Sequence, residues 1–232
     1  SFFDEISSFE LPVMSLPPLG GKPGVQSVKQ FGLLAQLMKK YPQLRITIAL
    51  HAAADDSPAV YFSFASQTAT DLLQQEGASL QNLTLLFVGS SYPIAAEGNN
   101  RRAEIFVENP GVLPFALYRP PLPPEALKAK FFQKTMSSLS FRVAVASGEE
   151  LPKLFELYPD GLVEARVADG VQTFSPSIYL THASAAEWQQ VLVQDGYQHA
   201  KVAAYLNGRE LSRAEAAEHA ADFPDLEGFI RQ

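Results

Sequence analysis

The sequence predicts an α+β protein built of two α/β two-layer sandwich domains. Three observations predict this: helical and strand-like hydrophobic periods alternate along the chain, prolines gather near its middle, and the composition suits a folded core. Of 232 residues, 47% are hydrophobic and 19% charged, which is too little charge for a disordered chain. We therefore expect domains over residues 1–108 and 125–232, joined by a stiff proline-rich linker over 109–124.

Composition excludes several functional classes. The formal net charge of −7 opposes nonspecific binding to nucleic acid, so we expect no nucleic-acid partner. The chain has no cysteine, which excludes disulfides, thiolate metal sites and thiol nucleophiles. No stretch reaches the roughly 18 to 20 apolar residues of a membrane-spanning helix, and residues 1–5 lack the pattern of a signal peptide. The abrupt start is in keeping with the C-terminal piece of a longer protein.

The first half alternates helices and strands. Apolar residues recur at helical spacing after Gln26 until Lys39 and Lys40, where cations suit a helix end and Pro42 stops the helix. Strict alternation of apolar residues then predicts a strand, and Gly77 is expected to end a second helix. The expected elements are a helix over 26–40, a strand over 44–50, a helix over 65–75 and strands over 83–88 and 102–107. This order predicts a two-layer sandwich.

Three motifs in this half resemble a known family. They are Ile-Thr-Ile-Ala-Leu-His over 46–51, Gly-Ser-Ser-Tyr-Pro-Ile over 89–94 and Asn-Arg-Arg-Ala-Glu-Ile over 100–105. With them, residues 1–108 resemble the OmpA-like peptidoglycan-associating domain. That family holds the diaminopimelate of the peptidoglycan stem peptide between an aspartate and an arginine, with groups near the Asn-Arg-Arg segment. The resemblance implies a weak peptidoglycan-binding set: His51, Asn100, Arg101 and Arg102.

The motif departs from the family where the ligand would be held. His51 is followed by two alanines instead of the expected aspartate, and Ala65 stands at the arginine position. We therefore expect that the stem-peptide site is lost, leaving at most a weak anion patch. Asn100, Arg101 and Arg102 would then cap and pair at the start of the last strand, and His51 would be a buried strand-end histidine. The alternative is that Asp55 or Asp56 leans back into the pocket.

The second half predicts the order β-α-β-β-α-β, an antiparallel sheet with two helices on one side and an open opposite face. Acids and Pro152 open the first helix, Asp169-Gly170 favours a hairpin, and Ser184 with Glu187 forms a capping box. The expected elements are a strand over 140–147, a helix from 149, strands over 162–167 and 171–181, a helix from 184, a strand over 199–206 and a helical extension over 212–221.

Residues 138–217 resemble the SPOR-related domain of envelope proteins from the Bacteroidetes lineage. The resemblance rests on the ordered motifs over 141–147 and 196–209, with Gly161 between them. It implies a ferredoxin-like fold whose open sheet face binds peptidoglycan glycan strands that lack stem peptides. The glycan-binding candidates are Arg142, Gln172, Phe174, Tyr179 and Tyr205. The alternative is that these aromatic rings belong to the core, as we expect of Trp188.

The chain carries no recognisable catalytic motif, so we expect no enzyme, no metal and no cofactor. Asp55 and Asp56 near His51 are interpreted as turn and capping residues instead of cation ligands. The predicted function is a non-catalytic cell-envelope protein that tethers or scaffolds at peptidoglycan, in the periplasm and associated with the outer membrane. The alternative is a scaffold of a gliding or secretion assembly that binds another envelope protein and no peptidoglycan, an inference by analogy.

Overall fold

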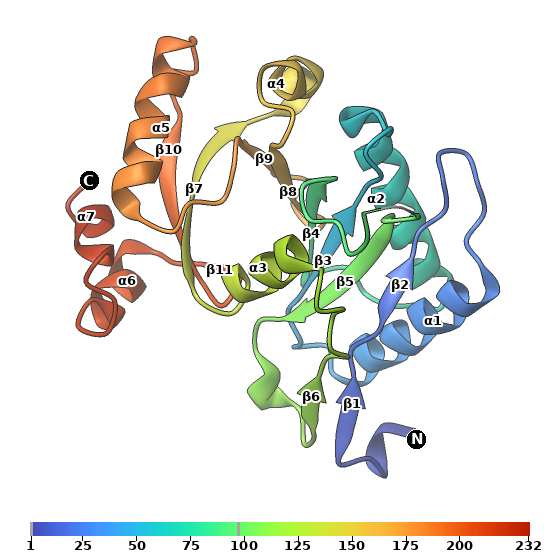
Figure 1. The fold of residues 1–232 in the computed structure, drawn as a ribbon. Helices are drawn as coiled ribbons and strands as arrows, with labels where there is room; N and C mark the ends of the chain where they lie inside the picture. Colours follow the sequence, from blue (N-terminus) through green and yellow to red (C-terminus); the bar gives the residue numbers. More distant parts are fainter. Residues whose placement is uncertain (1, 97) are drawn as a thin grey trace.

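The computed structural model describes residues 2–96 and 98–232, and it confirms the α+β class (Figure 1). Within these residues the strands form one nine-stranded sheet in the order β11-β10-β7-β9-β8-β4-β3-β5-β2, beside a two-stranded sheet of β1 and β6. The sequence led us to expect a separate sheet in each half, whereas the structure joins both sets of strands into one. No helix in the described part of the chain is long and apolar enough to cross a membrane.

The first half follows the predicted order. Strand β3 pairs in parallel with β4 and antiparallel with β5, and β2 adds to the outer edge of β5. Helix α2 begins at Pro58, earlier than expected, because a proline at the first helical position has no N–H to satisfy. The elements are β1 (Ser8–Glu10), β2 (Val13–Ser15), α1 (Val25–Lys40), β3 (Ile46–His51), α2 (Pro58–Gln75), β4 (Leu83–Gly89) and β5 (Arg102–Val107), after a short 3-10 helix (Phe2–Asp4).

The second half has the predicted β-α-β-β-α-β order, and its strands lie antiparallel as β10-β7-β9-β8, which is ferredoxin-like. Thr181, three residues before Ser184, caps α5 by accepting a hydrogen bond from the Ser184 N–H, so the capping box that we predicted at Ser184 and Glu187 does not begin this helix. The elements are β7 (Leu139–Ala146), α4 (Leu151–Leu157), β8 (Leu162–Arg166), β9 (Gln172–Ser175), α5 (His182–Gln194), β10 (Lys201–Leu206), β11 (Arg209–Glu210), α6 (Arg213–His219) and α7 (Leu226–Ile230).

Pairing of β4 with β8 joins the two halves. The register runs antiparallel from Thr84 opposite Arg166 to Phe87 opposite Val163. Beside this join the Phe87 ring packs edge-on against Phe155, with 6.0 Å between ring centroids, so the apolar core is continuous from one half to the other. The division of the chain at residues 109–124 stays a prediction. That segment contains β6 (Ala116–Tyr118), which pairs in parallel with β1.

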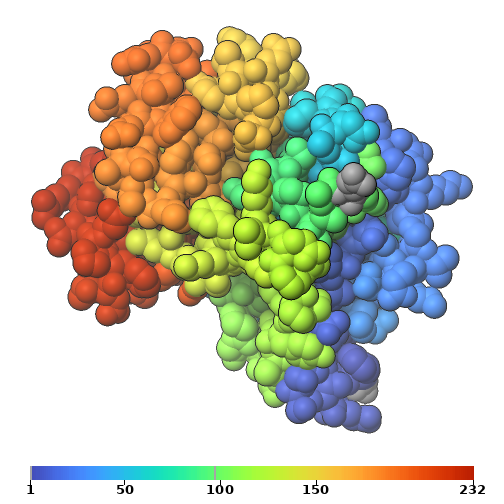
Figure 2. Space-filling model, viewed as in Figure 1, coloured from blue at the N-terminus to red at the C-terminus, as the bar shows by residue number. Residues whose placement is uncertain are grey.

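Different helices cover the two faces of the nine-stranded sheet. Helices α1, α2, α4 and α5 pack on one face, here the helix face, and bury its apolar side chains. Helix α3 (Leu127–Thr135) packs on the opposite face, here the α3 face, where Phe132 and Met136 contact Leu86, Phe106 and Leu162. Figure 1 shows α3 in front of the middle of the sheet, and Figure 2 shows the residues around it at the centre of this side of the molecule. The face that we expected to be open is therefore partly covered.

Candidate functional site

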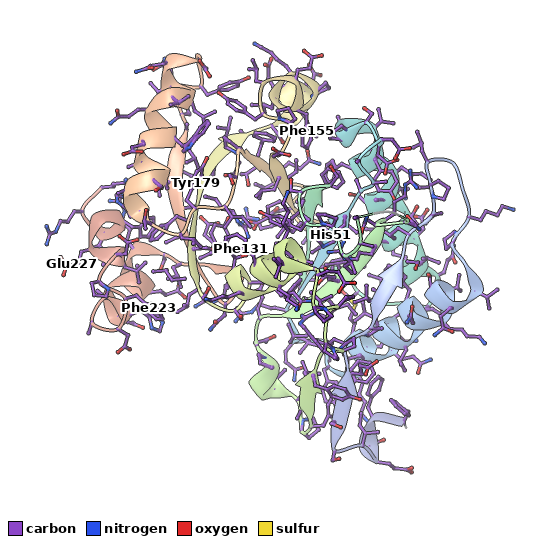
Figure 3. All side chains as sticks on the ribbon, in the orientation of Figure 1. His51, Phe131, Phe155, Tyr179, Phe223 and Glu227 are labelled. Carbon is purple, nitrogen blue, oxygen red and sulfur yellow. The ribbon has the colours of Figure 1, made fainter. Side chains whose placement is uncertain are left out.

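Strands β3 and β5 place three polar side chains on the α3 face. His51 lies directly opposite Arg102 in the register, and Ala49 lies opposite Glu104. Because alternate residues of a strand share a face, His51, Arg102 and Glu104 project together toward α3. Their side chains are 1%, 5% and 0% exposed, respectively. With Gln133 of α3 they form what we call the Glu104 cluster (Figure 3 labels His51).

The Glu104 carboxylate is the centre of this cluster. Its Oε1 accepts a hydrogen bond from Arg102 Nε at 2.9 Å, and its Oε2 accepts one from Gln133 Nε2 at 2.9 Å. His51 Nε2 lies 3.1 Å from Oε1, in a geometry too bent for a regular hydrogen bond. The Phe132 ring covers His51 edge-on at 5.3 Å between centroids. Protein groups therefore surround the Glu104 carboxylate and the His51 ring. The hydrogen bond from Gln133 attaches α3 to the sheet.

Burial sets the protonation of the cluster. It lowers the pKa of His51 to about 4, against the opposite effect of the Glu104 carboxylate, because the charged imidazolium would lose its hydration. Burial alone would raise the pKa of Glu104, but the neighbouring His51 and Arg102 lower it below its ordinary value. At neutral pH the cluster therefore holds a neutral imidazole beside one carboxylate and one guanidinium.

Arg101 lies in a second, separate network, here the Arg101 cluster. Its Nε and Nη2 donate to the two carboxylate oxygens of Asp56 at 2.9 and 2.8 Å, and Nη2 also donates to Asp55 at 3.4 Å. The guanidinium lies 5.9 Å from the Tyr61 ring of α2, and the Ala53 N–H donates to Asp56 at 2.8 Å. Asp56 therefore pairs with an arginine of this chain and bonds the Ala53 N–H, and no hydrogen bond or ion pair joins it to His51 in the described part of the chain.

Asn100 organises the loop before β5. Its Oδ1 accepts hydrogen bonds from the N–H groups of Ile94 and Ala95, and its Nδ2 donates to the Ala95 carbonyl at 2.9 Å. Of the four predicted residues, the structure brings the side chains of His51 and Arg102 together, and Arg102 Nη1 donates to the Asn100 carbonyl at 3.4 Å. The side chains of Asn100 and Arg101 lie in other networks. Sequence reasoning missed Glu104, although its position two residues after Arg102 on a strand was a signal that the two share a face.

Two of the second-half candidates meet on the α3 face. Arg142 Nη1 donates to Glu164 Oε2 at 2.6 Å, and its guanidinium lies 3.8 Å from the Tyr205 ring centroid. Arg142 and Tyr205 are both only 3% exposed. Glu164 was not foreseen, because its partner lies 22 residues away along the chain and the sequence carries no signal of the pairing.

The other three candidates lie elsewhere. Phe174 is on the helix face, fully buried, and packs edge-on against Phe155 with 5.3 Å between ring centroids. Gln172 is two residues away on the same face, half-buried, and Tyr179 is buried in the core beside Phe141. The five predicted residues therefore do not form one surface. Trp188, which we expected in the core, is 39% exposed.

No family model matches the chain, and no curated protein matches it. Among solved structures, the C-terminal domain of Helicobacter pylori MotB is similar, with a TM-score of 0.36 and 17% identity over 42% of this chain and 84% of that one. The periplasmic domain of the same MotB has a TM-score of 0.32 and 19% identity over 37% of this chain and 63% of that one. The peptidoglycan-associated lipoprotein from Burkholderia pseudomallei has a TM-score of 0.35 and 17% identity over 41% and 88%. Likenesses this low carry no argument about what this chain binds.

Proposed function

We propose that this chain is a non-catalytic protein of the cell envelope that acts as a tether or scaffold at peptidoglycan, in the periplasm and associated with the outer membrane. The proposal is supported by the OmpA-like motifs over residues 46–51, 89–94 and 100–105 and by the SPOR-like motifs of the second half. Within this role the stem-peptide site of the first half is closed, so contact with peptidoglycan does not depend on diaminopimelate.

The main support for a closed stem-peptide site is the ion pair between Arg101 and Asp56. A zwitterionic amino-acid terminus needs a carboxylate for its ammonium group and a guanidinium for its carboxylate. Here the two groups satisfy each other through two parallel hydrogen bonds at 2.8 and 2.9 Å, and their side chains are 17% and 7% exposed. A ligand would have to break this pair before gaining either contact, which removes most of the affinity that it could obtain.

A second candidate function is a scaffold that binds another envelope protein and no peptidoglycan. It is favoured by the burial of the second-half candidates, since Phe174, Tyr179 and Tyr205 are at most 7% exposed. Aromatic rings that are covered by protein cannot stack on sugar rings.

Co-sedimentation with purified sacculi tests both candidates. We expect the protein to sediment with sacculi, and free diaminopimelate in excess to leave the bound fraction unchanged. Stronger sedimentation with sacculi stripped of stem peptides by an amidase would add support for glycan binding. No sedimentation with either preparation would favour the second candidate. Saturable competition by diaminopimelate, lost in Asp56→Ala, would contradict the closed site.

A further inference from the structure

A groove of about 780 Å³ lies between α3 and the segment that contains β6. Its floor includes Phe106 of β5 and Met136 after α3, and its walls include Lys130 and Lys134 of α3 and Arg119 after β6. The groove is outside the Arg101 cluster, and it borders the Glu104 cluster only at Gln133. The groove therefore lies apart from the Arg101–Asp56 pair that we propose closes the stem-peptide site.

Three cations line the groove, and one of them, Arg119, also interacts electrostatically with the Glu104 carboxylate. Within residues 2–96 and 98–232, Arg119, Lys130 and Lys134 form no ion pair, and Lys130 Nζ donates only to the Pro124 carbonyl, at 3.2 Å. The Arg119 guanidinium is held over the Phe106 ring at 4.0 Å from its centroid and donates to the Ile105 carbonyl. The acid among the lining residues is Glu108, which accepts a hydrogen bond from Thr47 and lies 3.8 Å from Arg45. In a chain of net charge −7, this is a local reversal of charge.

The edge of β6 offers backbone groups to the same groove. Strand β6 pairs with β1 in parallel through its first and last residues: the Ala116 N–H donates to the Ser7 carbonyl, and the Tyr118 carbonyl accepts from the Leu11 N–H. Alternate residues of a strand direct their backbone groups to opposite sides. The N–H and C=O of Leu117 therefore turn away from β1, and Leu117 lines the groove.

We propose that this groove binds an extended acidic peptide segment of a partner protein, which adds a strand at the free edge of β6 and places its carboxylates against Lys130 and Lys134. Backbone hydrogen bonds to an edge strand give such complexes affinity, and alternate side chains give them specificity. Lysines four residues apart on a helix lie about 6 Å apart, and alternate side chains of a strand lie about 6.6 Å apart. Two acids at alternate positions therefore match the two ammonium groups.

Fluorescence anisotropy with the full chain tests the proposal. The probe is a fluorescein-labelled dodecapeptide of alternating glutamate and valine, and the comparison peptide replaces every glutamate with lysine. We expect the acidic peptide to bind and the basic peptide not to bind. The charge reversal Lys130→Glu with Lys134→Glu should weaken binding by about tenfold or more. The matched control, Lys22→Glu with Lys29→Glu, makes the same change of charge at exposed positions outside the groove and should change affinity by less than about twofold.

Backbone methylation tests the added strand without altering the protein. Two further acidic peptides are N-methylated, one at the glutamates and the other at the valines, and we expect one of them to lose binding because its edge N–H groups are blocked. Unchanged affinity of both peptides, or of the Lys130→Glu, Lys134→Glu variant when circular dichroism shows it folded, would overturn the proposal. So would equal binding of the basic peptide. Because the titration contains no peptidoglycan, its result is separate from that of the sacculus experiment.

Discussion

The two faces of the central sheet differ in the chemistry that holds them. On the helix face, buried apolar residues such as Ile48, Phe87 and Phe174 form a core that continues across the β4–β8 pair. On the α3 face, buried charges occur in both halves, around Glu104 in one and around the Arg142–Glu164 pair in the other. The hydrophobic effect stabilises a fold without requiring a particular orientation of the side chains. A buried ion pair adds little net stability, but removing one of its two partners is strongly destabilising. The helix face therefore supplies most of the stability. On the α3 face, the buried charges fix the position of α3, because Gln133 bonds to Glu104.

The largest expected effect is on the helix face. Phe174→Ala removes a fully buried ring that packs against Phe155, and such changes cost about 4 kcal/mol in the free energy of unfolding. Urea unfolding measures this change. The matched control is Phe131→Ala on α3, where the ring is 41% exposed and the cost should be about 1 kcal/mol or less. Equal losses in the two variants would contradict the importance of the helix face.

A somewhat smaller effect is expected from the charge at the centre of the α3 face. Glu104→Gln keeps the shape of the side chain but leaves the buried guanidinium of Arg102 without its counter-charge, which should cost about 3 kcal/mol. The measurement is again urea unfolding, with Glu187→Gln, an exposed position on α5, as the control that should change stability by less than about 0.5 kcal/mol. A loss no larger than in the control would show that the Glu104 cluster does not hold α3 in place.

A third and smaller effect is expected in the pH dependence of stability, which reports on the burial of His51 on the α3 face. The pKa of His51 is about 4 in the folded protein and about 6.5 in the unfolded chain, so between these values the unfolded chain binds more protons. Stability is therefore fully present above about pH 6.5 and is lost as the pH falls toward 4. From pH 7 to pH 5 the wild type should lose about 2 kcal/mol more than His51→Gln, in which the other titrating groups are the same. Parallel stability curves for the two proteins would contradict a buried, neutral His51.

Local patterns predicted most elements but not their partners. The expected hairpin forms between β8 and β9 through the loop over 167–171, in which Gly170 has φ 69° and its N–H donates to the Arg166 carbonyl, because such a loop depends on residues close along the chain. Strand β4 also carried a signal of its neighbours. Its run of apolar residues is buried on both faces, as is typical of a central strand and not of an edge. That run indicated that β4 would pair with a strand on each side, but it did not indicate that one of them would be β8.

The candidate sites were harder to predict than the fold. The family motif implied that His51, Asn100, Arg101 and Arg102 bind peptidoglycan, which stays a prediction, and it could not indicate that Arg101 would pair with Asp56, 45 residues earlier. In the second half, the register separated Phe174 from Arg142, because neighbouring strands place paired residues on the same face and Phe174 pairs with Val145. A list of aromatic and polar residues holds no such information until the pairing is known.

Local sequence patterns were enough to predict the α+β class, the order of most helices and strands, and the departure of the first half from a diaminopimelate-binding motif. Hydrophobic periodicity, turn residues and missing charges are local properties, so they can be identified along the chain. Three features became visible only in the folded chain: one sheet runs through both halves, α3 covers its middle, and a cationic groove lies beside β6. Those features arise from contacts between distant segments, such as Gln133 with Glu104 and Arg142 with Glu164. Such contacts are strong only where the two groups are buried together, and that burial exists only after the chain has folded.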